Sequence, residues 1–268
     1  MRTFKLILAY DGTDFAGWQR QPGPRTLQGV FEEVLGRVTG APVTVEASGR
    51  TDAGVHALGQ VVSFSSETRL EPAVLERALN AELPDEMLVR KLVEAPAGFH
   101  ARFDAIGKRY RYALQDGPQR NPFGRRYAWH CRHRLDAAAM HEAAQLLLGK
   151  HDFRSFETQW PNRETSVRTI TDILVARRAG QGGDPFGPFS AGLHVEVAAD
   201  GFLYNMVRAI VGTLVEVGRG AREMAWVAEV LAAQDRKAAG QTAPPEGLFL
   251  LHVDYPPEQT AATRNSQA

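Results

Sequence analysis

Apolar and polar residues follow two different periods through residues 1–93. Every second residue from Phe4 to Tyr10 has a large apolar or aromatic side chain, and this period of two predicts a strand. After Thr26, a typical N-cap residue, apolar residues recur at helical spacing, and Gly40 follows the last of them. Further strands are expected over 43–47, 59–64 and 87–93, and a second helix from Pro72. The resulting order, β-α-β-β-α-β, is typical of the split βαβ or ferredoxin-like arrangement.

The second half of the chain also mixes strand and helix patterns. Within residues 108–114, Tyr110 and Tyr112 share one face of an alternating strand, opposite Arg109 and Arg111. Two α/β halves are therefore expected, and no residue-level repeat relates them. The other expected elements are a helix from its cap at Asp136 to Leu148, closed by Gly149; strands over 169–177, 193–198 and 248–253; and helices over 203–217 and 222–231.

Composition places the chain among globular proteins. Its 268 residues are 44% hydrophobic and 23% charged, which suits one large domain or two of ordinary size. No apolar run approaches the length of a membrane span, and the run that ends at Tyr10 contains Lys5, so we interpret it as a strand and not as a signal peptide. Because Cys131 is the single cysteine, no intrachain disulfide can form, and we expect a cytoplasmic protein.

Charge is distributed unevenly along the chain, although the formal net charge is zero. Between residues 99 and 134, only Asp104 and Asp116 oppose a series of cations with aromatic residues among them. Cations neutralise phosphates and aromatic rings stack on unpaired bases, so this segment is predicted to contact single-stranded or looped RNA. The alternative is a solvated strand face whose aromatic residues enter the core. The basic and aromatic residues are Arg102, Lys108, Arg109, Arg111, Arg120, Arg125, Arg126, Arg132 and Arg134, with Phe99, Phe103, Tyr110, Tyr112, Phe123, Tyr127 and Trp129.

A polar segment lies between two apolar strand patterns, at residues 47–60. It presents a cation, a hydroxyl and a carboxylate in succession: Arg50, Thr51 and Asp52. Polar groups on a loop that rigid strands carry commonly form an active site. In the alternative interpretation the segment is a turn in which Asp52 bonds its own backbone and Arg50 is a surface charge. Glycines that permit sharp bends or the close approach of a ligand lie at Gly49, Gly54 and Gly59.

A second unusual segment, residues 201–208, begins an apolar helix. Arg208 lies near the N-terminus of that helix, where its charge opposes the helix macrodipole and favours an anionic partner. The sharper hypothesis pairs Arg208 with Asp52 in a partly dry cleft, which keeps the carboxylate ionised. The alternative is an arginine whose stem lies along the core and whose charge ends in water.

Two other patterns indicate neither a metal nor a nucleotide cofactor. The run from His130 to His133 has metal-binding side chains, but no second cluster at ligand spacing accompanies it. Gly182, Gly183 and Gly187 lie outside any strand–glycine–helix context and precede no Gly-Lys-Ser/Thr sequence. We therefore expect no metal site and no cofactor.

With these features in place, the chain resembles the pseudouridine synthases, and within them the TruA family of tRNA pseudouridine synthases, over nearly its whole length. The most specific motif runs from Gly49 to Ala57. The loop 178–190 is longer than the resemblance leads us to expect, and the residues beyond Tyr255 lie outside it. Supporting motifs lie at 10–13, 17–19, 99–103, 109–112 and 202–210.

The resemblance implies an α+β pseudouridine synthase fold. Two ferredoxin-like α/β halves with mostly antiparallel sheets are expected, with the active site in the cleft between them. Residues 1–104 would form an N-terminal domain that carries the catalytic aspartate loop, and residues 105–255 a C-terminal domain that carries the tyrosine and arginine motifs. Residues 256–268 are expected to be a disordered tail.

The resemblance also implies an isomerase, formally an intramolecular transferase, that converts uridine to pseudouridine at positions 38 to 40 of the tRNA anticodon stem-loop. It implies no cofactor, no metal, and a homodimer that binds tRNA across both subunits. Asp52 is the implied nucleophile, and Arg208 its partner. Tyr110 would stack on the target base and is a candidate for a part in the loss of the C5 proton. Whether Asp52 first attacks C6 of the base or C1′ of the ribose stays open.

Further residues are implied to contact the substrate. Arg50 would help to hold the target nucleotide out of the stack. Two segments are implied to touch the tRNA: Phe99, His100, Ala101, Arg102 and Phe103, and Glu164, Thr165, Ser166, Val167 and Arg168.

Two other functions fit part of the residue pattern. A non-catalytic RNA-binding module for the anticodon arm accounts for the basic and aromatic segment but leaves Asp52 and Arg208 without a role. A hydrolase that uses Asp52 to activate water is a different base-acting enzyme. Release of the uracil C5 proton distinguishes the isomerase from both.

Overall fold

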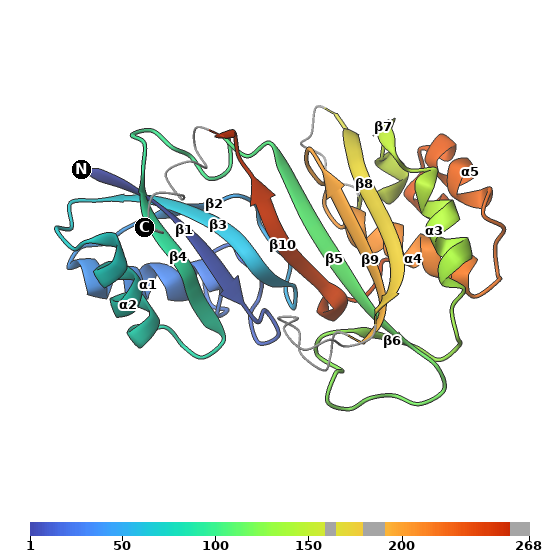
Figure 1. Cartoon of the computed structure of the whole chain (residues 1–268), viewed down its shortest axis with the longest axis horizontal. Helices are drawn as coiled ribbons and strands as arrows, with labels where there is room; N and C mark the ends of the chain where they lie inside the picture. Colours follow the sequence, from blue (N-terminus) through green and yellow to red (C-terminus); the bar gives the residue numbers. More distant parts are fainter. Residues whose placement is uncertain (159–164, 179–190, 258–268) are drawn as a thin grey trace. The chain divides into compact units, whose positions relative to one another are not determined.

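The computed structural model describes residues 1–158, 165–178 and 191–257, which group into two compact units (Figure 1). Unit 1 comprises Met1–Lys108 and the chain from Leu250 onward, and unit 2 comprises Arg109–Phe249. The expectations for the loop after Arg178 and for the tail fall on 179–190 and 258–268, outside the described residues. Each unit is built from strands and helices that the residue pattern largely accounts for.

Unit 1 begins with the predicted order β-α-β-β-α-β, which is confirmed. Strand β1 pairs antiparallel with β3 on one side and with β4 on the other, and β2 and the final strand β10 both pair with β3. Helix α2 contacts both β4 and α1. The elements are β1 (Arg2–Tyr10), α1 (Leu27–Thr39), β2 (Val45–Ala47), β3 (His56–Ser66), α2 (Pro72–Glu82), β4 (Met87–Ala95) and β10 (Leu248–Asp254).

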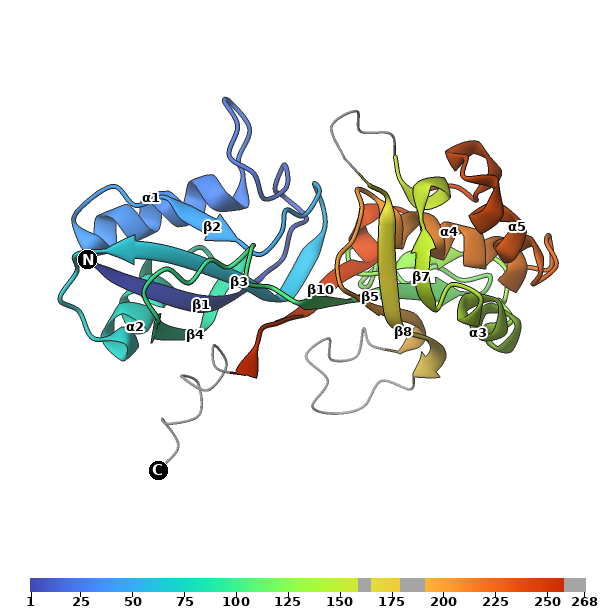
Figure 2. The ribbon, with the colours of Figure 1, turned by 90° about the horizontal axis from the view of Figure 1, so that it is seen from above.

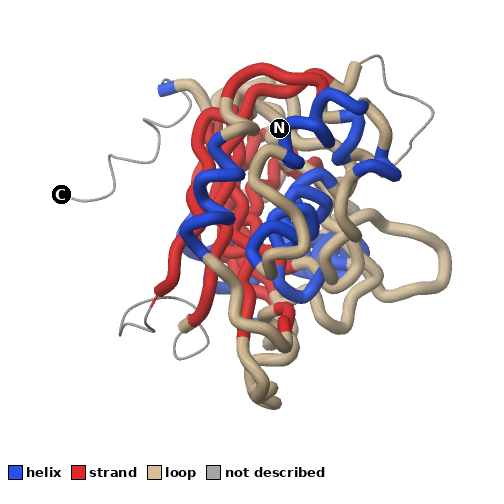
Figure 3. Tube along the Cα trace, turned by 90° about the vertical axis from the view of Figure 1, so that its right-hand side faces the viewer, coloured by secondary structure: helices blue, strands red, loops and turns tan. Residues whose placement is uncertain are grey.

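Unit 2 contains strands in the order β5-β9-β8-β7, with the short strand β6 parallel to β5. Helix α3 contacts both β8 and α4, which Figure 2 labels, and Figure 3 distinguishes helices from strands by colour. The elements are β5 (Gly107–Asp116), β6 (Trp129–Cys131), α3 (Ala137–Gln145), β7 (Gly149–Asp152), β8 (Val167–Arg178), β9 (Gly192–Ala199), α4 (Met206–Gly218) and α5 (Trp226–Ala233), with 3₁₀ turns at Arg154–Phe156, Arg236–Ala238 and Pro245–Gly247. The α+β class with mostly antiparallel pairing is confirmed.

The ends of α1 show how local sequence sets an element. The Thr26 side chain accepts a hydrogen bond from the Gly29 N–H and so caps the first turn. At the other end, Gly40 adopts a left-handed φ of 77°, and its N–H donates to the Gly36 carbonyl. Both signals were readable from the chain, and both are confirmed.

Several predicted element boundaries in unit 2 are wrong. Helix α3 ends at Gln145, and Gly149 begins strand β7. Helix α4 begins at Met206 because Asn205 adopts a left-handed φ of 62°, which no helix continues through. Helix α5 covers Trp226–Ala233 and so begins later than 222. The three-residue strand β6 and four-residue strand β7 were not predicted, because such short strands show no alternation.

Gly59 is predicted both as the last glycine of the polar segment and as the first residue of a strand, and it lies inside strand β3. A Cβ at this position would overlap the Leu251 carbonyl of β10. The glycine therefore allows two neighbouring backbones to approach closely, and it bends no loop. The polar loop itself is correspondingly shorter, with β3 beginning at His56.

The core of unit 2 centres on helix α4, whose residues are almost all buried. The chain that follows α5 packs directly against this helix. The approach is so close that a Cβ at Gly212 would overlap the Gln241 carbonyl. The Ala243 N–H donates to the Arg208 carbonyl at 3.0 Å in the same contact. No helix in the described ranges combines the length and the apolarity needed to cross a bilayer.

Two glycine substitutions in helices should have opposite effects on stability. Gly212→Ala should lower the free energy of unfolding by about 1–3 kcal/mol, because the new methyl group displaces the backbone at Gln241. Gly36→Ala should raise it by about 0.5–1 kcal/mol, because a Cβ there meets only ordinary contacts in α1. Urea unfolding of both variants checks this, and equal effects at the two positions would contradict the close approach.

Candidate active site

The predicted nucleophile lies in the loop between β2 and β3. The Val55 N–H donates to the Asp52 carbonyl at 3.2 Å, which closes a tight turn, and Gly54 supplies the left-handed φ of 77° that the turn requires. The Asp52 side chain is half-buried, whereas that of Arg50 is exposed. A tight turn therefore follows Asp52, and the loop presents a carboxylate that is partly withdrawn from water.

Buried groups hold the residue before this carboxylate. The hydroxyls of Tyr10 and Thr51 are hydrogen-bonded at 2.8 Å, and both side chains are buried. The Thr51 carbonyl accepts a hydrogen bond from the Trp18 N–H at 2.9 Å. Burial raises the pKa of Tyr10, so this hydroxyl stays protonated. The position of Thr51 is therefore determined from its side chain and from its backbone.

A second group of hydrogen bonds holds the start of the loop. Ser48 donates from Oγ to Gln60 Oε1 at 2.6 Å, and Gln60 Nε2 donates to the Gly49 carbonyl at 2.8 Å. The ammonium of Lys108 donates to the Ser48 carbonyl at 2.7 Å. Ser48 and Gln60 are both buried. The loop between Ser48 and Val55 is thus anchored on both sides of Arg50.

Most residues of this anchoring network were not identified from the chain. Gln60 carried the clearest signal, since it is a polar residue next to the apolar run that begins at Val61. The sequence pattern presents Tyr10 as the end of a strand and the start of a supporting motif, and Lys108 only as one cation of the basic segment. His56 is also buried, and its Nδ1 accepts a hydrogen bond from the Gly12 N–H at 3.1 Å.

Arg208 occupies the first turn of α4, as predicted, and its guanidinium has defined partners within unit 2. Nε donates to the Ala243 carbonyl at 2.6 Å, and Nη1 donates to Asn205 Oδ1 at 2.8 Å. The side chain is half-buried. Asn205 is held in turn by its amide, which donates to the Thr158 hydroxyl at 3.0 Å. The orientation of Arg208 is therefore set by its own unit, and its pairing with Asp52 stays a prediction.

The two tyrosines of β5 have different environments. Tyr110 is 8% exposed, and its ring meets that of Phe202 edge to face at a centroid distance of 5.0 Å. Tyr112 is fully buried, its hydroxyl donates to the Pro244 carbonyl at 2.7 Å, and burial raises its pKa well above the usual value. Tyr112 is thus a core residue, while Tyr110 packs against the segment that leads into α4.

The predicted tRNA segment 99–103 divides into interior and surface residues. Phe99 and Ala101 are buried in a cluster of unit 1, where the Phe99 ring packs on Tyr255 at 5.3 Å. Phe103 is 73% exposed, and its ring lies 4.2 Å from that of His100. The guanidinium of Arg102 lies 5.5 Å from the Phe103 ring. The surface therefore presents His100, Arg102 and Phe103 together.

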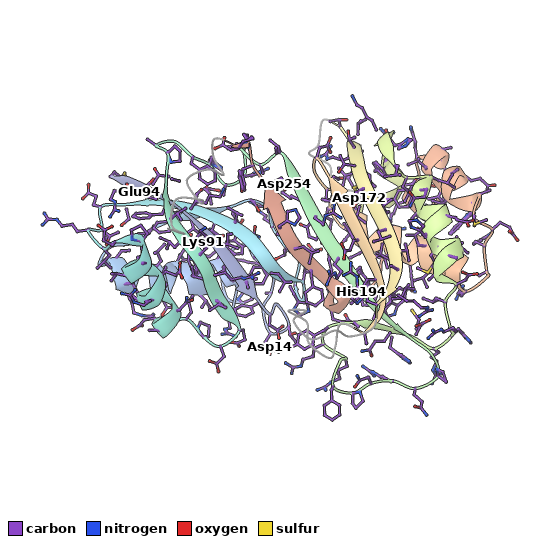
Figure 4. The ribbon with its side chains drawn as sticks, viewed as in Figure 1. Asp14, Lys91, Glu94, Asp172, His194 and Asp254 are labelled. Carbon is purple, nitrogen blue, oxygen red and sulfur yellow. The ribbon has the colours of Figure 1, made fainter. Side chains whose placement is uncertain are left out.

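The other arginines of the basic segment fall into two groups, those of β5 that form ion pairs and those of the following connection that are exposed. Arg109 pairs with Asp172 at 2.7 Å, and Arg111 pairs with Glu196 at 2.9 Å. Figure 4 shows Asp172 on β8, beside the strand that carries Glu196. The charges of these two arginines are thus compensated within unit 2. The exposed cations of the connection that follows β5 are Arg120, Arg125, Arg126, Arg132 and Arg134, and the exposed Phe123 lies among them.

The segment 164–168 is only partly described, because Glu164 lies outside the described residues. Thr165 is exposed, and Val167 begins β8. The Ser166 hydroxyl donates to Glu157 Oε2 at 2.7 Å. The Arg168 guanidinium donates to the Val167 carbonyl at 2.6 Å, which holds it near its own backbone.

The histidine–cysteine run lies around β6. Burial raises the pKa of Cys131 to about 11, so its thiol is neutral near pH 7. His130 Nε2 lies 2.9 Å from the Gly117 carbonyl. Within the described ranges, no three histidine, cysteine, aspartate or glutamate residues are grouped so that they could hold a metal ion.

Comparison with known proteins adds a family to this geometry. Residues 6–104 and 143–256 match the sequence profile of a family described as tRNA pseudouridine synthase. The tRNA pseudouridine synthase A of Geobacillus kaustophilus is 50% identical over 256 residues, which cover 95% of this chain and 95% of the relative. The protein of the same name from Brevibacillus brevis is 46% identical over 255 residues, covering 95% and 100%. That from Syntrophotalea carbinolica is 44% identical over 260 residues, covering 96% and 98%.

The buried hydroxyl pair beside Asp52 should show energetic coupling. Thr51→Val leaves the Tyr10 hydroxyl short of a partner, and Tyr10→Phe does the same to Thr51, so each change should cost about 1–3 kcal/mol of unfolding free energy. The double variant should cost less than the sum, because it removes both hydroxyls at once. Urea unfolding of the three variants measures the coupling, and strictly additive losses would show that the two hydroxyls do not support each other.

Proposed function

Because this chain belongs to the tRNA pseudouridine synthase family, we propose that Asp52 is the nucleophile with which it isomerises uridine at positions 38 to 40 of the tRNA anticodon stem-loop. As a member of the family, the protein is an isomerase that converts uridine in tRNA to pseudouridine. The observation that carries the proposal is the half-buried carboxylate of Asp52 on a loop that is anchored on both sides.

The reaction suits a carboxylate nucleophile. The glycosidic bond between C1′ and N1 breaks, a bond between C1′ and C5 forms, the C5 proton leaves, and N1 takes up a proton. Atoms and electrons balance without an oxidant or a group donor. A covalent bond from Asp52 to the substrate divides one difficult substitution into two easier steps. Attack at C6 and attack at C1′ both satisfy this balance.

Arg208 and Tyr110 complete the proposed catalytic set. The Arg208 guanidinium, oriented by Ala243 and Asn205, is proposed to pair with the Asp52 carboxylate and keep it ionised. Tyr110 is proposed to stack on the target base and to take part in the loss of the C5 proton. The target nucleotide has to leave the helical stack, which costs a few kcal/mol. Stacking on Tyr110 and a contact from Arg50 would offset that cost.

The RNA contact is proposed to use the surface of His100, Arg102 and Phe103. An aromatic side chain as exposed as Phe103 offers a face on which an unpaired base stacks, and Arg102 beside it offers a phosphate contact. The buried Phe99 and Ala101 would support this surface from below. The described residues Thr165 to Arg168, with Glu164 before them, are proposed as a second contact.

Assembly and location complete the proposal. We expect a homodimer that binds tRNA across both subunits, on the basis of the resemblance set out above. A cytoplasmic location is consistent with a tRNA substrate and with the single, buried cysteine, Cys131.

Asp52→Asn should abolish turnover while the fold and the tRNA affinity are kept, because only the nucleophile is lost. The assay uses unmodified tRNA labelled with tritium at C5 of uracil and counts tritium released to water. Asp14→Asn, the same change at an exposed aspartate of unit 1 that Figure 4 labels, is the matched control and should release tritium at the wild-type rate. Release by the Asp52 variant would disprove the nucleophile assignment, and no release by the wild type despite tight binding would favour the non-catalytic module.

Arg102→Gln should weaken tRNA binding and should lower the slope of log affinity against log salt by about 0.7–0.9, as expected for one lost phosphate contact. Arg37→Gln is the control, because Arg37 is an exposed arginine of α1 that already pairs with Glu33 and Glu82. Titrations at several salt concentrations measure both slopes. An unchanged slope for the Arg102 variant would remove this surface from the phosphate contacts.

A further inference from the structure

Lys108 is a half-buried cation that contacts the aspartate loop. It lies at the start of β5, and its ammonium donates to the buried carbonyl of Ser48 at 2.7 Å. Burial lowers the pKa of Lys108 to about 8, and the positive charge of Arg102 adds to this effect. A lysine serving only solubility would keep its charge in water. The Lys108 ammonium instead donates a hydrogen bond to the Ser48 carbonyl.

The loop receives a second side-chain donor one residue later. Gln60 Nε2 donates to the Gly49 carbonyl at 2.8 Å, while Gln60 Oε1 accepts from the Ser48 hydroxyl at 2.6 Å. The two consecutive carbonyls of Ser48 and Gly49 are therefore held by Lys108 and Gln60. The bond from the ammonium is charge-assisted, which makes it the stronger of the two.

Gly49 is matched to the lysine. A Cβ at this position would lie 2.8 Å from Lys108 Nζ, closer than such atoms approach in proteins. The φ of Gly49 lies outside the left-handed region, so its backbone conformation is open to other residues. We therefore attribute the glycine at position 49 to the space that the Lys108 ammonium occupies, and not to a backbone conformation that only glycine adopts.

We propose that Lys108 is a positioning residue for catalysis: by fixing the peptides of Ser48 and Gly49, it sets where the loop places Asp52. The inference rests on the proposed function, since it concerns the placement of the proposed nucleophile. Lys108 acts through the backbone and has no contact with the reacting atoms in this proposal. A displacement of about 1 Å at a nucleophile can cost about 100-fold in rate, so one anchoring bond is enough to matter.

The first experiment replaces the ammonium with an apolar side chain of similar length. Lys108→Met should lower kcat for tritium release by about 10-fold or more, while KM and the tRNA affinity change less than about 2-fold and the melting temperature is kept. Lys91→Met is the matched control, because Lys91 is a half-buried lysine on the outer strand β4 of the same unit (Figure 4). It should leave kcat unchanged.

The second experiment removes the space instead of the charge. In Gly49→Ala the new methyl group pushes Nζ away from the Ser48 carbonyl, so kcat should fall as in Lys108→Met while the fold is kept. A methionine ends one atom earlier than lysine, at the level of the lysine Cε, which lies 3.8 Å from such a Cβ in an ordinary contact, so there the methyl group displaces nothing. The double variant Gly49→Ala, Lys108→Met should therefore be no worse than Lys108→Met alone, and additive losses would overturn the pairing of the two residues.

The remaining outcomes separate this inference from other roles. A raised KM with unchanged kcat in Lys108→Met would make the lysine a phosphate contact and would overturn the positioning role. A lowered melting temperature with unchanged kcat per folded molecule would reduce Lys108 to a structural residue. Asp52→Asn is measured in parallel: if that variant keeps turnover, the proposed nucleophile fails, whereas an inactive Asp52→Asn with a fully active Lys108→Met overturns only the role of Lys108.

Discussion

The hydrogen bonds of one short loop connect most of the functional features of unit 1. Residues 48–55 belong to neither β2 nor β3, so their backbone groups find partners elsewhere: Trp18 supplies an N–H, and Gln60 and Lys108 supply side-chain donors. Unpaired backbone groups in such a buried setting would be costly. Every partner is a residue of a neighbouring strand or loop, so the position of Asp52 depends on the packing of the whole unit. This is how a loop gains the rigidity that a catalytic group requires.

In unit 2, hydrogen-bond acceptors stabilise a cation near the N-terminus of a helix. The macrodipole of α4 opposes a positive charge in its first turn, yet Arg208 lies there because the Ala243 carbonyl and the Asn205 side chain accept its hydrogen bonds. That arrangement requires residues 240–243 to lie against α4, and Gly212 makes the approach possible. Asn205 adopts a left-handed φ, so helix α4 begins only after it. The Asn205 side chain accepts a hydrogen bond from Arg208. Backbone geometry and side-chain orientation are thus linked at this point.

Charge pairing explains how a chain of zero net charge can serve an RNA substrate. The charges of Arg109 and Arg111 on β5 are compensated by Asp172 and Glu196, so these two arginines are less available to bind phosphate. Arg102 and the arginines that follow β5 are exposed, and among them Arg134 pairs with Asp116 at 3.6 Å. Paired and exposed arginines are therefore distributed unevenly, so a net charge of zero is compatible with a locally basic surface. The net charge of the whole chain does not show which arginines are paired and which are exposed.

Local signals along the chain were sufficient to predict the first six elements of unit 1, both ends of α1, and the candidate segments around Asp52 and Arg208, because periodicity, caps and motifs are local properties. Only the tertiary structure decided that α4 begins after Asn205, that Gly59 serves a strand contact, and that Phe99 is buried while Phe103 is exposed. It alone connected Lys108 to Ser48, which lies 60 residues earlier in the chain. The physical reason is that burial and hydrogen-bond partners depend on which distant segments pack together, and neither the period of the pattern nor the residue types encode that pairing locally.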